Sequence, residues 1–159
     1  MKFAATLALG VMAAAPVLAE AHATGDAAAG EGVFRQCASC HVVENEAGEV
    51  LAGRNAKTGP NLYGVAARPY GSVEGFRYSD SMVAAGEAGN IWTEAAFVPY
   101  VQDPTGHLRE VLDDSSARGK MTFRLRGEED ALNVWAYLVS IGPELTEEQM
   151  QQLSAAEGS

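Results

Sequence analysis

The sequence predicts a small all-α protein whose helices are joined by long loops. Several apolar segments repeat at helical spacing behind good capping residues, and no convincing alternating run of β-branched residues occurs. Residues 42–67 are rich in Gly, Asn and Pro, which favours turns. Loops this extended are unusual in a compact domain. We therefore expect something other than side chains to fill its centre.

The first residues have the pattern of a secretory signal peptide. Lys2 gives a positive start, an apolar, alanine-rich run extends to Leu18, and small residues follow. Cleavage after Ala19 would remove residues 1–19, and cleavage after Ala23 is the alternative. An uncleaved membrane anchor is a competing interpretation, but the run is at the short limit for spanning a bilayer. We expect export to the periplasm, with no stable membrane insertion after processing.

The mature chain has the length of one compact domain. We assign residues 20–143 to this domain and residues 144–159 to an acidic C-terminal extension. The whole chain has 21 acidic and 11 basic residues, and its formal net charge is −10 at pH 7. This balance argues against a nucleic-acid partner, because neutralising phosphates requires a basic surface. We expect a monomer.

Asp26 predicts the first helix, because its carboxylate can cap a helix through residues 27–34 that ends at the cysteines. Ala29 and Phe34 lie on the same apolar face of this helix. After the long loops, a second short helix is expected over residues 79–85.

A third helix is predicted from Thr93, a good N-cap, to Val101. Pro99 lies inside it, and proline in a helix interior removes a donor and clashes with the preceding turn. We therefore expect this helix to be kinked or to begin later than Thr93 suggests. A turn-rich stretch is expected from Asp103 to Lys120.

The clearest helix spans residues 128–140, where apolar residues recur at helical spacing before a Gly-Pro pair stops it. Thr146 and Gln149 form a capping-box pair. They predict a small acidic helix that ends near Leu153.

Residues 37–41 read Cys-Ala-Ser-Cys-His, the C-x-x-C-H pattern of c-type haem attachment. Two thiols at this spacing can form thioethers with the two vinyl groups, and the imidazole that follows can bind the iron. A disulfide would be strained, a thioredoxin-like pair needs a βαβ context, and a structural zinc site needs about four ligands. We predict one covalent haem on Cys37 and Cys40, with His41 as an axial ligand.

An iron held by one histidine has a sixth position to fill, and the ligand there decides what the protein does. Methionine is ordinarily a core gap-filler. Met121 stands out because a glycine-containing segment precedes it and the apolar Phe123 follows it. The residues alone leave four candidates, which are Met82, His107, Met121 and Met150.

The chain resembles a class I cytochrome c of the bacterial cytochrome c2 or c550 kind, over roughly residues 25–142. Gly30 and Phe34 resemble the family's first helix, whose glycine permits close crossing by the last helix. Val134 and Tyr137 resemble the residues that it crosses. The resemblance implies the class I cytochrome c fold, with long loops wrapped around one haem.

The resemblance also implies the residues around the haem. Residues 57–62 resemble the loop whose proline carbonyl accepts the proximal imidazole N–H, so Pro60 would orient His41. Tyr100 matches the tyrosine beside the methionine ligand, and Met121 matches the ligand itself. The positions that hydrogen-bond the haem propionates are matched by Arg68, Tyr78 and Trp92.

An iron with both axial positions filled by protein atoms can change oxidation state but cannot readily bind a substrate. The resemblance therefore implies a single-electron carrier and not an enzyme, with a high potential from its thioether ligand. Its donor would be a quinol-oxidising complex, and its acceptor a terminal oxidase, a reaction centre or a reductase. A haem enzyme or a gas sensor would need an open or displaceable sixth position. Basic residues such as Lys57 and Lys120 are expected to surround the docking face.

Overall fold

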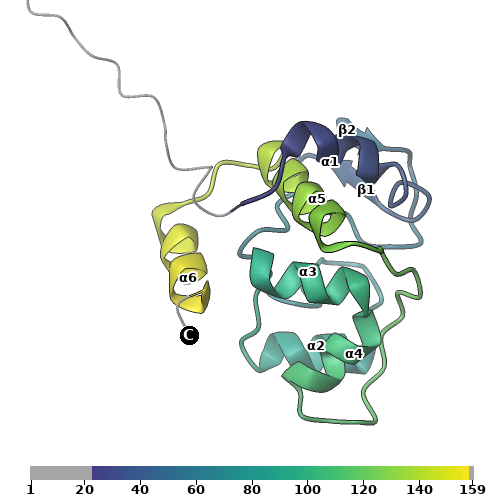
Figure 1. Cartoon of the computed structure of the whole chain (residues 1–159), viewed down its shortest axis with the longest axis vertical. Helices are drawn as coiled ribbons and strands as arrows, with labels where there is room; N and C mark the ends of the chain where they lie inside the picture. Colours follow the sequence, from purple (N-terminus) through teal and green to yellow (C-terminus); the bar gives the residue numbers. More distant parts are fainter. Residues whose placement is uncertain (1–22, 158–159) are drawn as a thin grey trace, which may run out of the picture.

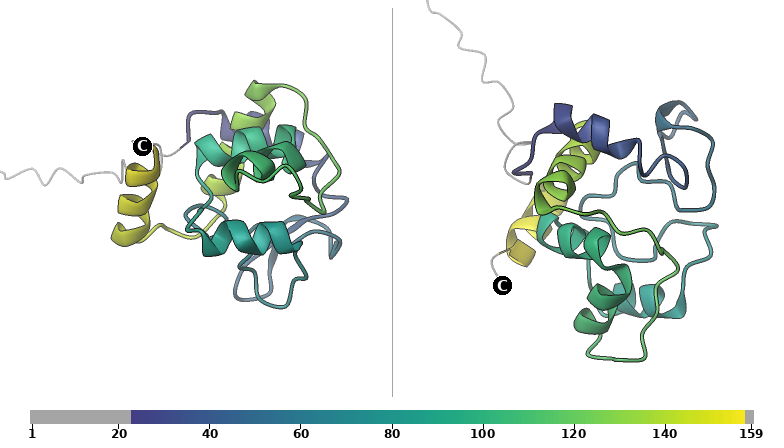
Figure 2. Two further views of the ribbon diagram at one scale, coloured as in Figure 1. Left: turned by 90° about the horizontal axis from the view of Figure 1, so that it is seen from below. Right: turned by 45° about the vertical axis from the view of Figure 1, so that its right-hand side comes forward.

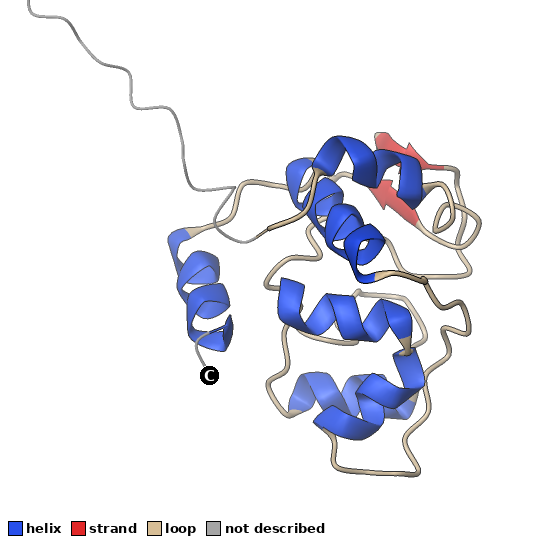
Figure 3. Ribbon diagram, viewed as in Figure 1, coloured by secondary structure: helices blue, strands red, loops and turns tan. Residues whose placement is uncertain are grey.

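A computed structural model describes residues 23–157 of the chain, and the predicted leader lies outside this part. The elements within it are α1 (Ala27–Phe34), β1 (Val42–Glu44), β2 (Val50–Gly53), α2 (Asp80–Glu87), α3 (Glu94–Gln102), α4 (Pro104–Val111), α5 (Glu128–Ser140) and α6 (Glu147–Glu157). Helices dominate, as predicted, and loops connect most of them (Figure 3). None of the helices described is long and apolar enough to cross a membrane.

The helices α1 and α5, from opposite ends of the domain, cross each other (Figure 1). A Cβ atom on Gly30 would collide with the backbone carbonyl of Asn133 and lie 2.8 Å from the Cβ of Tyr137. Only glycine therefore allows this approach. The side-chain oxygen of Asn133 also accepts a hydrogen bond of 2.7 Å from the amide of Asp26, and the ring of Phe34 lies 5.7 Å from that of Tyr137. The predicted crossing is confirmed.

Capping residues begin the helices where the sequence predicts. The side chains of Asp26, Ser79 and Thr93 each accept a hydrogen bond from a backbone amide in the first turn of α1, α2 and α3. Thr146 and Gln149 form the predicted capping box before α6, which runs beyond its predicted end. Helix α5 has the predicted bounds.

Helix α4 is a correction, because the sequence analysis predicts turns from Asp103 to Lys120. The side chain of Asp103 accepts a hydrogen bond of 3.1 Å from the amide of Gly106 and so caps the helix. Pro104 occupies the first helical turn, where its missing N–H costs nothing. Leu108 is fully buried and anchors the helix to the core.

Helix α3 begins directly after Thr93, so the alternative of a later start is wrong. Pro99 lies within it and costs one helical hydrogen bond. The helix is nevertheless stabilised from outside by packing on α5, where the ring of Phe97 lies 5.2 Å from the fully buried Trp135. Tertiary packing here outweighs the local cost.

The strands β1 and β2 form an antiparallel hairpin that the sequence analysis does not predict. Each is only three or four residues long, and β2 is largely exposed, so neither has an alternating pattern. Figure 2 shows that α6 lies to one side of the other helices, on the side away from the hairpin. The loops between α1 and α2 complete the opposite side.

Candidate functional site

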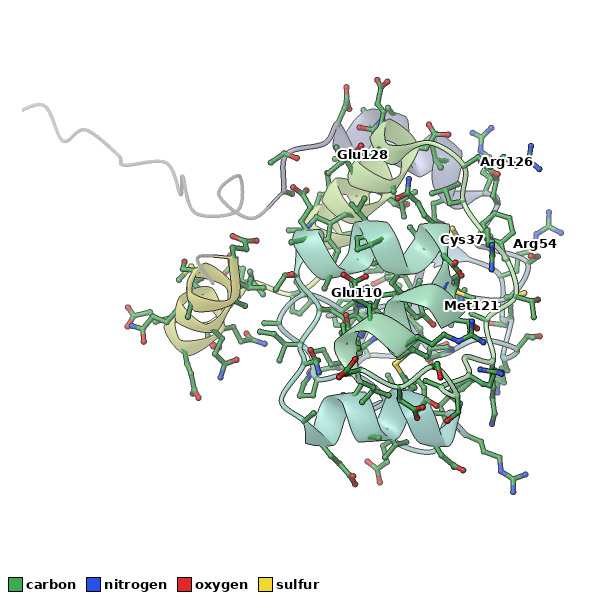
Figure 4. The ribbon with its side chains drawn as sticks, turned by 60° about the horizontal axis from the view of Figure 1, so that its bottom comes forward. Cys37, Arg54, Glu110, Met121, Arg126 and Glu128 are labelled. Carbon is green, nitrogen blue, oxygen red and sulfur yellow. The ribbon has the colours of Figure 1, made fainter. Side chains whose placement is uncertain are left out.

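A cavity of about 600 Å³ opens among the loops, within the size range of ligand pockets. Figure 4 shows the labelled Cys37 and Met121 on the same side of the molecule. Every residue that the sequence analysis places at the haem lines this cavity, namely Cys37, Cys40, His41, Pro60, Arg68, Tyr78, Trp92, Tyr100 and Met121. The fold thus brings residues from five separate segments of the sequence to one cavity.

The His41 imidazole is held in one orientation. Its Nδ1 atom lies 2.9 Å from the carbonyl oxygen of Pro60, and because a carbonyl can only accept, Nδ1 carries the proton. Burial lowers the pKa of His41, and the bond to Pro60 only partly opposes this. The ring is therefore neutral, and Nε2 presents the lone pair that a metal needs. A Cβ atom on Gly59 would collide with the ring, so the loop packs directly against it.

The loop that carries Pro60 is fastened to the hairpin by Asn61. The side-chain oxygen of Asn61 accepts a hydrogen bond of 3.0 Å from the amide of Glu44, and its Nδ2 donates to the carbonyl of Glu44 at 2.7 Å. The next amide, of Leu62, donates to the carbonyl of Val42 at 2.9 Å. The segment therefore pairs with β1 almost as a third strand would, which fixes the Pro60 carbonyl. Sequence analysis missed this support, because Asn61 and Glu44 lie 17 residues apart.

Arg68 is half-buried and holds the same loop. Its guanidinium donates to the carbonyl of Tyr63 at 2.9 Å and to that of Asn61 at 3.1 Å. Guanidinium has five N–H donors, so others are left for a ligand in the cavity. Burial raises the pKa of Tyr78, although the nearby Arg68 opposes this. The Tyr78 phenol therefore keeps its proton at neutral pH and can donate a hydrogen bond.

The four candidates for the sixth iron ligand separate in the structure. Met82 and Met121 line the cavity, whereas His107 and Met150 do not. His107 is buried elsewhere, with Nε2 2.8 Å from the hydroxyl of Tyr70. Met150 belongs to α6. The geometry therefore leaves two thioethers, one on α2 and one on the loop before α5.

The two cysteines are half-buried, and no disulfide joins them. Burial, with a smaller contribution from Cys40, raises the pKa of the Cys37 thiol to about 11. Among residues 23–157, no group of three or more His, Cys, Asp or Glu side chains could hold a metal ion. Two thiols and a neutral imidazole on the wall of a large cavity fit a covalently attached haem. Fold and site thus define a haem protein of the c type.

Comparison with known proteins agrees with this class of haem protein. Cytochrome c2 of Rhodovulum adriaticum is 62% identical over 119 residues, which cover 75% of this chain and 94% of that protein. Cytochrome c-550 of Paracoccus pantotrophus is 42% identical over 135 residues, which cover 84% and 98%. The solved structure of cytochrome c2 from Rhodobacter sphaeroides has a TM-score of 0.74 at 50% identity, covering 76% of this chain and 99% of that one. No protein-family model matches the chain.

The chain belongs to the class I c-type cytochromes, in the group of cytochromes c2 and c-550. It carries covalently bound haem c and transports electrons, and it is not an enzyme. The predicted fold class, cofactor and general role are confirmed.

Proposed function

We propose that this chain is a periplasmic carrier of single electrons, with its haem linked to Cys37 and Cys40 and ligated by His41 and Met121. The observation that carries the proposal is the cavity that all four side chains line. The haem supplies reversible one-electron chemistry when bound. We further propose that residues 1–19 are a cleaved leader, residues 20–143 the haem domain and residues 144–159 an acidic extension.

The role of the protein is to hold the two axial ligands in a rigid position. The bond from His41 to Pro60 fixes the ring and raises its basicity. The segment around Met121 is tied on both sides, because the amide of Gly119 donates to the hydroxyl of Thr105 at 3.3 Å and that of Leu125 to the carbonyl of Val101 at 2.8 Å. Rigid ligands move little between oxidation states, which favours fast electron transfer.

The cavity wall also favours a high reduction potential. Apolar side chains from several elements line it, including Leu62, Val65, Phe97, Val101 and Val134. Such surroundings disfavour the extra positive charge of ferric iron, and a thioether ligand acts in the same direction.

Exchange of Met121 tests the ligation. Met121→Ala should let the reduced protein bind carbon monoxide and should lower the midpoint potential, because a coordination position opens. Met82→Leu is the matched control, since Met82 lines the same cavity, and it should change neither property. The visible spectrum with and without carbon monoxide measures both variants. If Met82→Leu opened the iron and Met121→Ala did not, the assignment would be wrong. Rapid binding of carbon monoxide by the unaltered protein would favour a gas sensor or haem enzyme.

The mouth of the cavity is the proposed docking face. The charged side chains that line the whole cavity are Lys57, Arg68, Arg77 and Lys120, and no Asp or Glu among the described residues lines it. Figure 4 shows Arg54 and Arg126 projecting on the same side as Cys37 and Met121. A basic face on a protein of net charge −10 creates a dipole that orients it toward an acidic partner. We propose a quinol-oxidising complex as donor, and an oxidase, reaction centre or reductase as acceptor.

A further inference from the structure

The indole N–H of Trp92 has no acceptor within the part of the protein that the structure describes. Trp92 lines the same cavity as His41 and is only 8% exposed. A buried tryptophan N–H usually has a hydrogen-bond partner, because an unsatisfied donor costs free energy. The N–H of Trp92 is therefore available to a ligand in the cavity, and a haem propionate is a suitable acceptor.

Aromatic rings surround this indole. Phe97 and Tyr100 meet it edge to face, with centroids 6.4 Å and 4.8 Å away. Tyr70 instead stacks on it, with centroids 3.9 Å apart and planes inclined by 22°. Tyr70 is 2% exposed and does not line the cavity. It therefore supports the indole from a side that does not border the cavity.

The backbone brings these two rings together but does not fix their final positions. Residues 67–70 pair with residues 90–92 in antiparallel fashion, and the amide of Trp92 donates to the carbonyl of Arg68 at 2.9 Å. This register makes Tyr70 and Trp92 diagonal neighbours on one face, within reach of each other as aromatic side chains. Stacked rings attract each other over a range of offsets. Stacking alone would therefore let the phenol slide on the indole.

A hydrogen bond removes this freedom. The hydroxyl oxygen of Tyr70 lies 2.8 Å from Nε2 of His107. Burial raises the pKa of Tyr70, and burial lowers that of His107, although Glu110 opposes the second shift. The phenol is therefore protonated and the imidazole neutral, so the hydroxyl donates and Nε2 accepts. Because hydrogen bonds are directional, this one sets the position of the phenol within its own plane.

The acceptor is itself held in place by the fold. His107 is buried in α4, directly before the fully buried Leu108. The ring of Tyr100, which also meets the indole of Trp92, lies edge to face with His107 at 6.0 Å. A continuous series of contacts thus runs from α4 through Tyr70 to the indole at the cavity.

We propose that Tyr70 and His107 are positioning residues, which hold the indole of Trp92 where its N–H meets a haem propionate. This inference rests on the proposed function, because it takes the haem to occupy the cavity. A donor at the propionate offsets negative charge near the iron. When the donor is held less firmly, that charge favours ferric iron and the reduction potential falls. The pair thus helps to keep the potential high, although neither residue lines the cavity.

The midpoint potential of the holoprotein and the exchange of the Trp92 indole proton, followed by NMR in the ferrous state, test the proposal. Tyr70→Phe and His107→Leu should each speed this exchange about tenfold through loss of one hydrogen bond. Each should make haem reduction about threefold less favourable, which is about 30 mV for one electron. His107→Gln keeps an acceptor and should leave both values near those of the unaltered protein. Tyr137→Phe is the matched control, because it removes a hydroxyl from a ring that packs on Phe34 outside the cavity, and it should change neither value.

A double variant separates positioning from a general loss of stability. Tyr70→Phe with His107→Leu removes both polar groups and leaves neither unsatisfied, so its denaturant midpoint should be close to that of the unaltered protein. Its proton exchange and potential should still match those of Tyr70→Phe, because no bond fixes the ring. Normal exchange and a normal potential in the double variant would overturn the proposal. A potential lowered as much by His107→Gln as by His107→Leu would also overturn it.

Replacement of Trp92 distinguishes failure of this inference from failure of the proposed function. Trp92→Phe removes the donor and should lower the potential at least as much as Tyr70→Phe. If Trp92→Phe lowered the potential and Tyr70→Phe did not, the placement of the haem would stand and the positioning role would be refuted. If Trp92→Phe left the potential unchanged, no propionate would meet the indole, and both the placement and the positioning role would be wrong.

Discussion

Replacing Gly30 by alanine tests the helix crossing on which the fold depends. The added Cβ would meet the backbone carbonyl of Asn133 in α5, and neither helix can yield without a shift of its backbone. Gly32 offers a matched control on the same helix, because nothing lies within 4 Å of a Cβ added there. Both substitutions gain the same helix propensity, so the difference between them isolates the crossing.

The expected magnitudes follow from that comparison. Glycine in a helix costs about 0.8–1 kcal/mol relative to alanine, so Gly32→Ala should stabilise the protein by up to about that amount. Overpacking typically costs about 1–3 kcal/mol, and a contact with backbone belongs at the upper end. Gly30→Ala should therefore be destabilised by about 1–2 kcal/mol after its gain in propensity. The two variants should differ by about 2–3 kcal/mol.

Denaturant unfolding, followed by the circular dichroism of the helices and by the absorbance of the haem, measures both variants. The midpoint should move in opposite directions, with the slope of each transition unchanged. Equal stabilities for Gly30→Ala and Gly32→Ala would refute the close crossing.

Three further predictions concern the site and its scaffold. Reversing Lys57 and Lys120 to Glu should slow bimolecular electron transfer several-fold at low ionic strength, and the difference should shrink as the salt concentration rises, with little change in the reduction potential. A double variant with an unchanged rate and an unchanged salt dependence would place the docking face elsewhere. Asn61→Ala should cost about 1–3 kcal/mol of stability, because the amide and carbonyl of Glu44 lose their side-chain partner. The Pro60 carbonyl should then be held less firmly, which should raise the reduction potential and let the ring N–H of His41 exchange faster by NMR. Asp26→Ala should cost about 1 kcal/mol in thermal unfolding through loss of the α1 cap, and an unchanged midpoint would contradict that role.

The sequence predicts most helices because their signals are local. A capping side chain and a helical repeat of apolar residues lie within a few positions of each other, and α5 shows both the repeat and its stop. Helix α4 has comparable signals in Asp103 and Pro104, but a proline and a glycine so close together also suggest a turn. Burial of Leu108 decides for the helix, and burial depends on the rest of the fold.

The residues of the site also divide into those with a signal in the sequence and those without one. The haem-attachment motif is local, and the family resemblance supplies the other cavity residues from distant segments. The supports behind them have no such signal: Asn61 bonds a strand too short to predict, and Tyr70 bonds His107 across 37 residues of sequence. His107 is a candidate ligand in the sequence and a hydrogen-bond partner of tyrosine in the structure. Only the fold distinguishes these roles.

The crossing of α1 and α5 also sets an order of events during synthesis and export. Asp26 and Asn133 bond across 107 residues, so α1 has no partner until nearly the whole domain has emerged. Cys37 and Cys40 emerge much earlier, immediately after α1. For that interval the attachment motif belongs to an open chain, and the last helix closes the domain only afterwards. The chain order thus gives a period in which the cysteines are accessible for thioether formation.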